Sequence, residues 1–264
     1  MRVAFIQTDP DFGRVRANVA SVLRRIEKTD ADLMVLPELF STGYQFKTRA
    51  EAMGLAERSD GYTVGSLTGA ARKKKAFIVA GFAERTDKRV YNSSFITGPG
   101  GLVGVYRKAH LFGDEKRIFT AGAAPYRVFD IGAARVGVMI CFDWIMPEVA
   151  RTLALKGADI IAHPSNLVLP YCPPAMITRS VENRVYTVTC NRVGVEERVR
   201  GARLEFIGTS QVVSPSGEVL ARAGRRGESV SVVEIDPLEA RDKHVTPAND
   251  LFRDRRPRLY GLEG

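Results

Sequence analysis

Cys141 is the residue whose type and position could most directly support covalent chemistry. It ends an apolar, β-branched run, Val136–Ile140, which predicts a buried strand because such side chains pack well on a pleated surface. The polar, proline-containing stretch Asp143–Glu148 predicts a turn into a helix. A thiol at a strand end is held rigidly and can still be reached by substrate, so Cys141 is a candidate nucleophile. The alternative is a packed core cysteine, since free cysteine is among the most buried residue types.

Two further reactive groups also follow predicted strands. Glu38 comes after the apolar run 32–36, where Pro37 stops the strand. Lys108 comes just after the apolar run Leu102–Tyr106. In open α/β architectures functional groups collect at strand ends, so the carboxylate, the ammonium and the thiol are expected to meet. Taken singly, Glu38 could instead be a solvated turn residue and Lys108 a surface charge.

The segments that carry these groups resemble the three signature blocks of the nitrilase superfamily of carbon–nitrogen hydrolases. The blocks occur in the family's order, Glu then Lys then Cys, in Leu36–Phe40, Tyr106–Phe112 and Ile140–Trp144 with Pro147-Glu148. The resemblance continues through Tyr91–Ser93, Ala158–Pro164 and Glu182–Tyr186. It therefore covers nearly the whole chain, from the first strand to about residue 236.

The resemblance implies a catalytic triad of Glu38, Lys108 and Cys141. A cysteine must lose its proton before it attacks, and Glu38 would act as general base and later return a proton to the leaving ammonia. The Lys108 ammonium would favour the thiolate. Together with the backbone N–H of Phe142, it would also stabilise the oxyanion of the tetrahedral intermediate.

The family also carries a second glutamate shortly after the lysine block, and Glu115 occupies that place. Its expected role is to orient the lysine or the substrate, or to position water. Asp114 is the competing candidate, and a solvated loop carboxylate is the plain alternative. Trp144, three residues past the nucleophile, is expected to line the acyl pocket, and Tyr44 and Asn166 are further candidates for that lining.

The composition fits an ordinary globular enzyme. The chain has 264 residues, with 45% hydrophobic and 26% charged residues, which is enough for one large α/β domain. No run approaches the roughly 18 apolar residues of a membrane span. The N-terminus lacks a signal-peptide pattern, so a cytoplasmic location is expected. The three cysteines and three histidines lack metal-ligand spacing, so no metal or cofactor is expected.

The formal net charge of +9 raises nucleic-acid binding as a competing function. The positive residues are spread along the chain and are not interleaved with stacking aromatic residues, as in 72–75, 198–203, 222–226 and 253–258. Such runs are usually solvated faces, so neither nucleic acid nor a membrane is expected as a partner. A basic field could instead steer an anionic substrate, such as a dicarboxylate mono-amide.

Strands alternate with helices along the chain. Strands are predicted at 2–7, 32–36, 77–83, 91–97, 102–106, 126–129, 135–140, 159–162, 185–191, 208–214, 219–221 and 229–236, and helices near 14–28, 65–75, 147–156 and 175–183. This pattern predicts an α/β fold in one domain over residues 1–264. The family resemblance implies a four-layer αββα sandwich of two mixed sheets covered by helices, and a homodimer or higher homo-oligomer. The polar tail 246–264 is predicted to pack on a partner subunit.

The bond that is cut stays open at the level of sequence. A nitrile and an amide can use the same three residues, and both lead through a thioester to an acid and ammonia. A short chain with an aspartate two residues after the cysteine, Asp143 here, favours a small aliphatic amide. The alternatives are a small aliphatic nitrile and an N-carbamoyl amine. A non-enzymatic binding protein, or acyl transfer to an acceptor other than water, is a further alternative.

Overall fold

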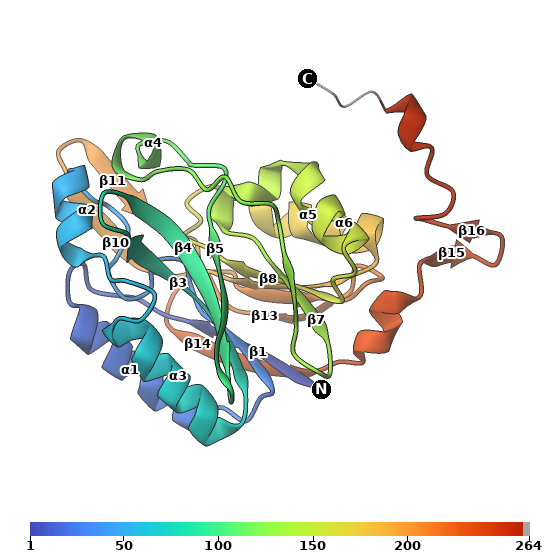
Figure 1. Cartoon of the computed structure of the whole chain (residues 1–264), viewed down its shortest axis with the longest axis horizontal. Coiled ribbons are helices and arrows are strands. Elements are labelled where there is room, and N and C mark those ends of the chain that lie inside the picture. The colour runs from blue at the N-terminus through green and yellow to red at the C-terminus, as the bar shows by residue number, and fades with distance from the viewer. Residues whose placement is uncertain (261–264) are drawn as a thin grey trace.

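The computed structural model describes residues 1–260 and contains two six-stranded mixed sheets that pack against each other (Figure 1). Across the first sheet the strands are, in order, β14 (Ser229–Glu234), β1 (Arg2–Gln7), β2 (Leu33–Val35), β3 (Phe77–Arg85), β4 (Val90–Gly98) and β5 (Gly101–Arg107). Across the second they are β13 (Val219–Arg222), β12 (Gln211–Val213), β9 (Tyr186–Cys190), β8 (Ile160–Pro164), β7 (Arg135–Val138) and β6 (Val128–Asp130).

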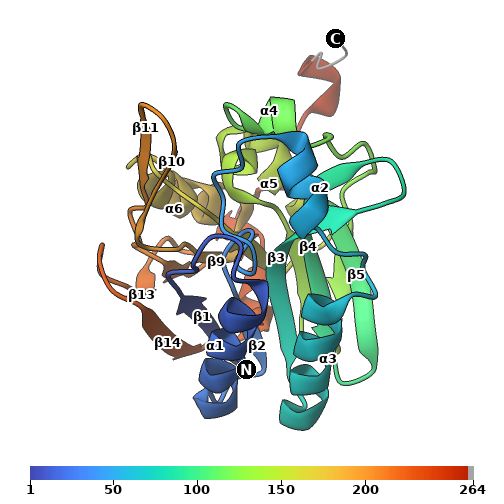
Figure 2. The same ribbon diagram turned by 90° about the vertical axis from the view of Figure 1, so that its left-hand side faces the viewer.

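Helices cover the outer face of each sheet. The first sheet is covered by α1 (Val15–Lys28) and α3 (Tyr62–Lys74), which lie side by side in Figure 2. The second is covered by α5 (Pro147–Leu155) and α6 (Cys172–Asn183). The result is the four-layer αββα sandwich that the family resemblance implied.

Alternation along the strands explains why the layers form. In β1, Val3 and Phe5 join the core cluster between the sheets, whereas Ala4 and Ile6 pack against α1 and α3. Successive side chains of a strand point to opposite faces, so an apolar residue at every position requires cover on both sides. Burying both faces of two sheets provides the main stabilising term of this fold.

The central strands of both sheets are parallel, namely β1, β2 and β3 in the first and β7, β8 and β9 in the second. Since β4 is antiparallel to β3 and β5 is antiparallel to β4, β5 runs in the same direction as β3. The carboxyl ends of β2 and β5 therefore lie at one edge of the first sheet. Residues that follow these strands are brought together there, as the rule for open α/β sheets predicts.

Several elements differ from the sequence predictions. The strand before the cysteine ends at Val138, and a short 3-10 helix, η1 (Cys141–Ile145), begins at the cysteine itself. The helices α2 (Arg49–Leu55) and α4 (Glu115–Ile118) and the hairpin of β10 (Val195–Val199) and β11 (Ala202–Glu205) were not predicted. They are short and polar, so they carry little hydrophobic periodicity. They gather at one end of the molecule (Figure 2).

The last part of the chain leads away from the two sheets (Figure 1). It contains η2 (Pro237–Arg241), β15 (His244–Thr246), β16 (Asn249–Asp250) and η3 (Pro257–Leu259). Ala240 and Phe252 still pack on the core, whereas Leu259, near the end of the described residues, is 74% exposed. Residues 261–264 of the predicted tail lie outside the described residues. Within residues 1–260, none of the helices combines the length and apolar character that a membrane crossing requires.

Candidate active site

A buried cluster of charges lies at the carboxyl edge of the first sheet. Lys108, which follows β5, donates from Nζ to Glu38 Oε1 at 2.7 Å and to Glu115 Oε1 at 2.8 Å. Asn92, at the start of β4, donates from Nδ2 to the same Glu38 oxygen at 2.6 Å. Glu38 and Lys108 have no exposed surface, and Glu115 is 5% exposed. The structure thus joins the carboxylate and the ammonium that the sequence predicted to meet.

The ionisation of this cluster follows from burial and from charge pairing. Burial raises the pKa of Glu38 to about 7, with Lys108 opposing the rise and Glu115 adding to it. Burial works to lower the pKa of Lys108, but the two carboxylates outweigh it and hold that pKa above its usual value. The lysine is therefore charged at neutral pH, while Glu38 is poised to exchange a proton.

Cys141 lies opposite this cluster, at the end of the second sheet. Its backbone is in the left-handed region, with φ of 40°, a conformation that costs an ordinary L-residue about 1–2 kcal/mol. His163, in β8, lies with Nε2 2.9 Å from the Cys141 carbonyl oxygen. Burial lowers the pKa of His163 to about 4, so the ring is neutral and donates to that carbonyl. The contact secures the strained turn.

The thiol is protonated in the resting site. Burial raises the pKa of Cys141 well above its ordinary value, and the charge of Glu38 adds to the effect, while Lys108 opposes it. The thiol is thus electrostatically coupled to both groups. A thiol in this state needs a base before it can react, and the pKa of Glu38, raised to about 7 by burial, would suit such a base.

Asp143 ties the lysine segment to the cysteine turn. Its buried carboxylate accepts hydrogen bonds from the Tyr106 hydroxyl at 2.8 Å, from the Ile140 N–H at 2.9 Å and from the His110 N–H at 3.2 Å. Nδ1 of His110 lies 2.8 Å from the same carboxylate. These partners flank the reactive lysine and the cysteine, so one carboxylate fixes the two segments relative to each other.

Glu115 and Asp114 have different surroundings. Glu115 accepts from the Tyr44 hydroxyl at 2.7 Å and from the Phe112 N–H at 3.1 Å, in addition to the lysine. The Asp114 side chain is 79% exposed and reaches only Arg117, at 3.8 Å. The geometry thus places Glu115, and not Asp114, in the cluster.

The structure corrects the predicted place of Tyr44. This residue does not line the cavity at the cysteine but a separate cavity beside Glu115. Its backbone N–H donates to Glu196 at 3.0 Å, which anchors the segment to the unpredicted β10–β11 hairpin. The hydroxyl therefore holds the Glu115 carboxylate in the charged cluster.

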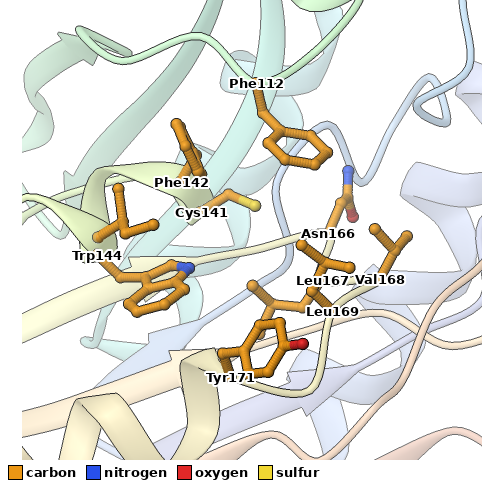
Figure 3. Close-up of a pocket in the computed structure, with 10 residues that line it drawn as sticks. Phe112, Cys141, Phe142, Trp144, Asn166, Leu167, Val168, Leu169 and Tyr171 are labelled. Carbon is orange, nitrogen blue, oxygen red and sulfur yellow. The ribbon is translucent and has the colours of Figure 1, made fainter.

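A cavity of about 220 Å³ opens at the nucleophile (Figure 3). Phe142, Trp144 and Asn166 line it, so two of the three predicted pocket residues, Trp144 and Asn166, lie there. The remaining lining residues are Phe112, Cys141, Ile145, Leu167, Val168, Leu169 and Tyr171. The wall of the cavity is almost wholly apolar and bears no charged side chain. The volume of the cavity lies below the usual range for pockets that bind drug-sized ligands.

Two residues that shape the site were not identified from sequence. A Cβ on Gly81, in β3, would lie 2.4 Å from the Glu38 Cα, so only glycine lets the glutamate approach the strand. Asn92 lies in the resembling segment Tyr91–Ser93, but the sequence indicates no role for it. The signal for both was a small or polar residue inside an otherwise apolar strand, which marks close backbone approach or a buried polar contact.

Among residues 1–260, no three side chains of His, Cys, Asp or Glu are close enough together to hold a metal ion. Lys108 lies between the two glutamates of the cluster and neutralises part of their charge. The arrangement instead offers a thiol, a base and a cation, which suits acyl transfer through a covalent intermediate.

Comparisons with known proteins agree with this chemistry. A family model described as carbon–nitrogen hydrolase matches residues 2–243. A protein named nitrilase, from Pyrococcus abyssi, is 48% identical over 264 residues, covering 98% of this chain and 99% of the relative. A protein named (R)-stereoselective amidase, from Pseudomonas sp., is 34% identical over 267 residues, covering 99% of this chain and 93% of the relative.

Among solved structures, the carbon–nitrogen hydrolase from Helicobacter pylori G27 has a TM-score of 0.89 and 26% identity. The match covers 100% of this chain and 98% of that one. Family model, relatives and fold agree with the sequence blocks, and the protein belongs to the carbon–nitrogen hydrolase family, within the nitrilase superfamily.

Proposed function

We propose that the protein hydrolyses small, uncharged aliphatic amides to the carboxylic acid and ammonia through a thioester on Cys141. The observation that carries this proposal is an unpaired acceptor in the charged cluster. Glu38 Oε2 is buried and has no hydrogen-bond partner, whereas Oε1 accepts from Lys108 and Asn92. A buried carboxylate oxygen without a donor is costly, and it would accept a proton from the thiol or an N–H of a substrate.

This acceptor favours an amide. A carboxamide has an –NH₂ group that can donate to Glu38, whereas a nitrile nitrogen carries no hydrogen. The same carboxyl group, with a pKa raised to about 7 by burial, can hold a proton and return it to the departing nitrogen.

The residues would act in the following order. Glu38 takes the Cys141 proton as sulfur bonds to the carbonyl carbon, and the C=O electron pair moves onto oxygen. The oxyanion is stabilised by Lys108 and the Phe142 N–H. This N–H lies in the first turn of η1, where no intrahelical acceptor is available. The C–N bond then breaks, and nitrogen leaves with the proton from Glu38. Glu115 orients the lysine throughout.

Water completes the cycle. Glu38 removes a proton from water as its oxygen attacks the thioester carbonyl, and a second tetrahedral intermediate forms. Collapse of this intermediate breaks the C–S bond, releases the acid and restores the thiol with the proton held by Glu38. Each step needs one base and one cationic oxyanion site, which Glu38 and Lys108 supply.

The cavity supports a small neutral acyl group. The aromatic rings of Phe112, Phe142, Trp144 and Tyr171 and the neighbouring aliphatic side chains surround the space beyond the thiol. A carboxylate or ammonium on the acyl chain would be desolvated against this wall without a partner. This argues against a dicarboxylate mono-amide and against a carbamoylated amine with a second charge.

A small aliphatic nitrile is the second candidate. The relative that is 48% identical is named nitrilase, and the same residues could form a thioimidate. The aspartate that favoured an amide at the sequence level, Asp143, points its carboxylate at Tyr106, His110 and Ile140. It therefore acts on the turn and does not contact the substrate.

Ammonia release from matched amides, nitriles and carbamoyl amines tests the proposal. We expect release from short aliphatic amides and none from the Cys141→Ala variant. Release from nitriles alone would establish the second candidate. A folded protein that releases ammonia from no member of the panel would overturn the assignment.

We also infer that residues 1–264 form one hydrolase domain, with 246–264 as a C-terminal tail, and that two copies pair through the α5–α6 face. Leu155, Ile145 and Val181, on or next to these helices, are each more than 40% exposed, and burying them would be favourable. Phe252 packs on the chain's own core, but residues 254–260 lead away from the two sheets (Figure 1), which suits contact with a partner.

A further inference from the structure

Asn166 is the polar exception in the apolar wall. The residue is 3% exposed, and neither Oδ1 nor Nδ2 has a hydrogen-bond partner. Other buried amides are at least half satisfied: Asn92 and Asn183 lack a partner for one atom each, and the Asn191 side chain bonds at both ends. Within residues 1–260, Asn166 is the buried amide with both polar atoms unpaired.

The backbone on both sides of Asn166 is held by hydrogen bonds, so the residue has a defined position at the cavity. Ser165 N–H donates to the Cys190 carbonyl at 2.8 Å, and Leu167 N–H donates to Asn191 Oδ1 at 2.7 Å. These bonds tie both neighbours to the last residue of β9 and to the residue that follows it. The residue is thereby held in the lining of the cavity that also contains Cys141, Phe112 and Leu167 (Figure 3).

An amide buried without partners is energetically costly, and such groups in native proteins call for an explanation. Here the amide borders the cavity in which the acyl group would lie. We propose that the Asn166 side chain hydrogen-bonds a neutral substituent of the substrate, a hydroxyl or carboxamide, on the carbon next to the scissile carbonyl. This inference rests on the proposed hydrolysis and deepens it by naming the substrate class.

Two features fix the position and charge of this substituent. Asn166 and Cys141 line the same cavity (Figure 3), and the backbone of Asn166 hydrogen-bonds the Cys141 sulfur, which would bond to the carbonyl carbon. The adjoining carbon of the acyl group would therefore lie close to the Asn166 amide. The lining contains no charged side chain, which excludes an ionised substituent. Both amide atoms are buried at the lining of this cavity and have no partner within the protein.

The test compares lactamide with isobutyramide, which replaces the hydroxyl by a methyl group of similar size. The variant is Asn166→Leu, which keeps the shape of the side chain and removes both polar atoms. A site that hydrogen-bonds a substrate group strongly rejects the analogue without it. We expect the native protein to favour lactamide in kcat/KM by about tenfold or more, and Asn166→Leu to remove this preference.

Leu169→Ala is the matched control, because Leu169 lines the cavity without a polar group, and its lactamide preference should persist. The same amides are titrated into Cys141→Ala and into the Cys141→Ala, Asn166→Leu double variant, which reports recognition without turnover. Equal preference in proteins with and without Asn166, or no lactamide preference at all, would overturn the inference. Absence of ammonia release together with Asn166-dependent binding would instead contradict the proposed reaction and leave this recognition intact.

Discussion

The two sheets contribute opposite kinds of group to the site. The first sheet supplies Glu38, Asn92 and Lys108, which are charged or polar and bonded mainly to one another. The second supplies Cys141 and Asn166, which lie against an apolar cavity and keep unpaired or strained features.

The two halves of the site, one supplied by each sheet, therefore have different roles. Charges in a low-dielectric interior persist only when paired and hydrogen-bonded, so the first half forms a rigid electrostatic frame. The second half is held mainly through its backbone, by His163 and Asp143, which leaves the sulfur and the amide free to meet a ligand. Variants in the first half should therefore affect stability and rate together, and those in the second mainly rate and selectivity.

Cys141→Ala should give the largest loss of activity with little change in stability. Removal of a nucleophile that acts within a catalytic set lowers kcat by on the order of 10⁵–10⁶. Because no buried charge is left unpaired, the free energy of unfolding should change by no more than about 1 kcal/mol. Ammonia release and urea unfolding check the two parts. A much larger loss of stability would contradict the division between the halves.

Lys108→Met should weaken both properties. The change leaves Glu38 and Glu115 facing each other in a buried site, which costs about 3–5 kcal/mol of stability. It also removes an oxyanion donor worth roughly 10²–10³ in rate. Urea unfolding would measure the first effect. Adding Glu38→Gln should recover part of the stability, since one uncompensated carboxylate is removed, but none of the activity.

Gly81→Ala tests whether close packing of β3 against Glu38 positions this glutamate. A Cβ at this position would lie 2.4 Å from the Glu38 Cα, so the glutamate must shift. Overpacking of this kind costs about 1–3 kcal/mol, and a small displacement of a catalytic group costs roughly 10²-fold in rate. Gly65→Ala, on α3, where a Cβ meets nothing within 4 Å, is the control. It should keep native activity and, because alanine favours a helix over glycine, be more stable by about 0.5–1 kcal/mol.

The pH dependence should report Glu38. Burial raises its pKa to about 7, and the ionised form is the base, so kcat/KM should fall as pH drops through this value. The Asn92 amide stabilises the ionised carboxylate. Asn92→Ala should therefore move the acid-side fall of kcat/KM to higher pH. If kcat/KM of this variant fell at the same pH as that of the native protein, the pH dependence would belong to a group other than Glu38.

The smallest effect on chemistry should come from the tail, which belongs to neither half. Deleting the residues after Asn249 should weaken a dimer while sparing the site, because the deleted segment contains none of the side chains that line the cavity at Cys141. Light scattering measures the mass, and an unchanged dimer would refute the role of the tail.

The sequence by itself determined the layers and the reactive residues. Alternating apolar strands and amphipathic helices specify which faces must be buried, and strand-end positions indicated Glu38, Lys108 and Cys141. These signals are local, because they depend on periodicity and on residue type within a few positions.

Only the tertiary structure decided how these residues act. The shared contacts of Lys108, the approach of Gly81 to Glu38 and the unpaired amide of Asn166 join segments far apart in the chain. Tyr44 was expected in the acyl pocket but bonds to Glu115, because the β10–β11 hairpin anchors its segment. Hydrogen bonding and burial at such sites depend on distances between strands that no local pattern encodes.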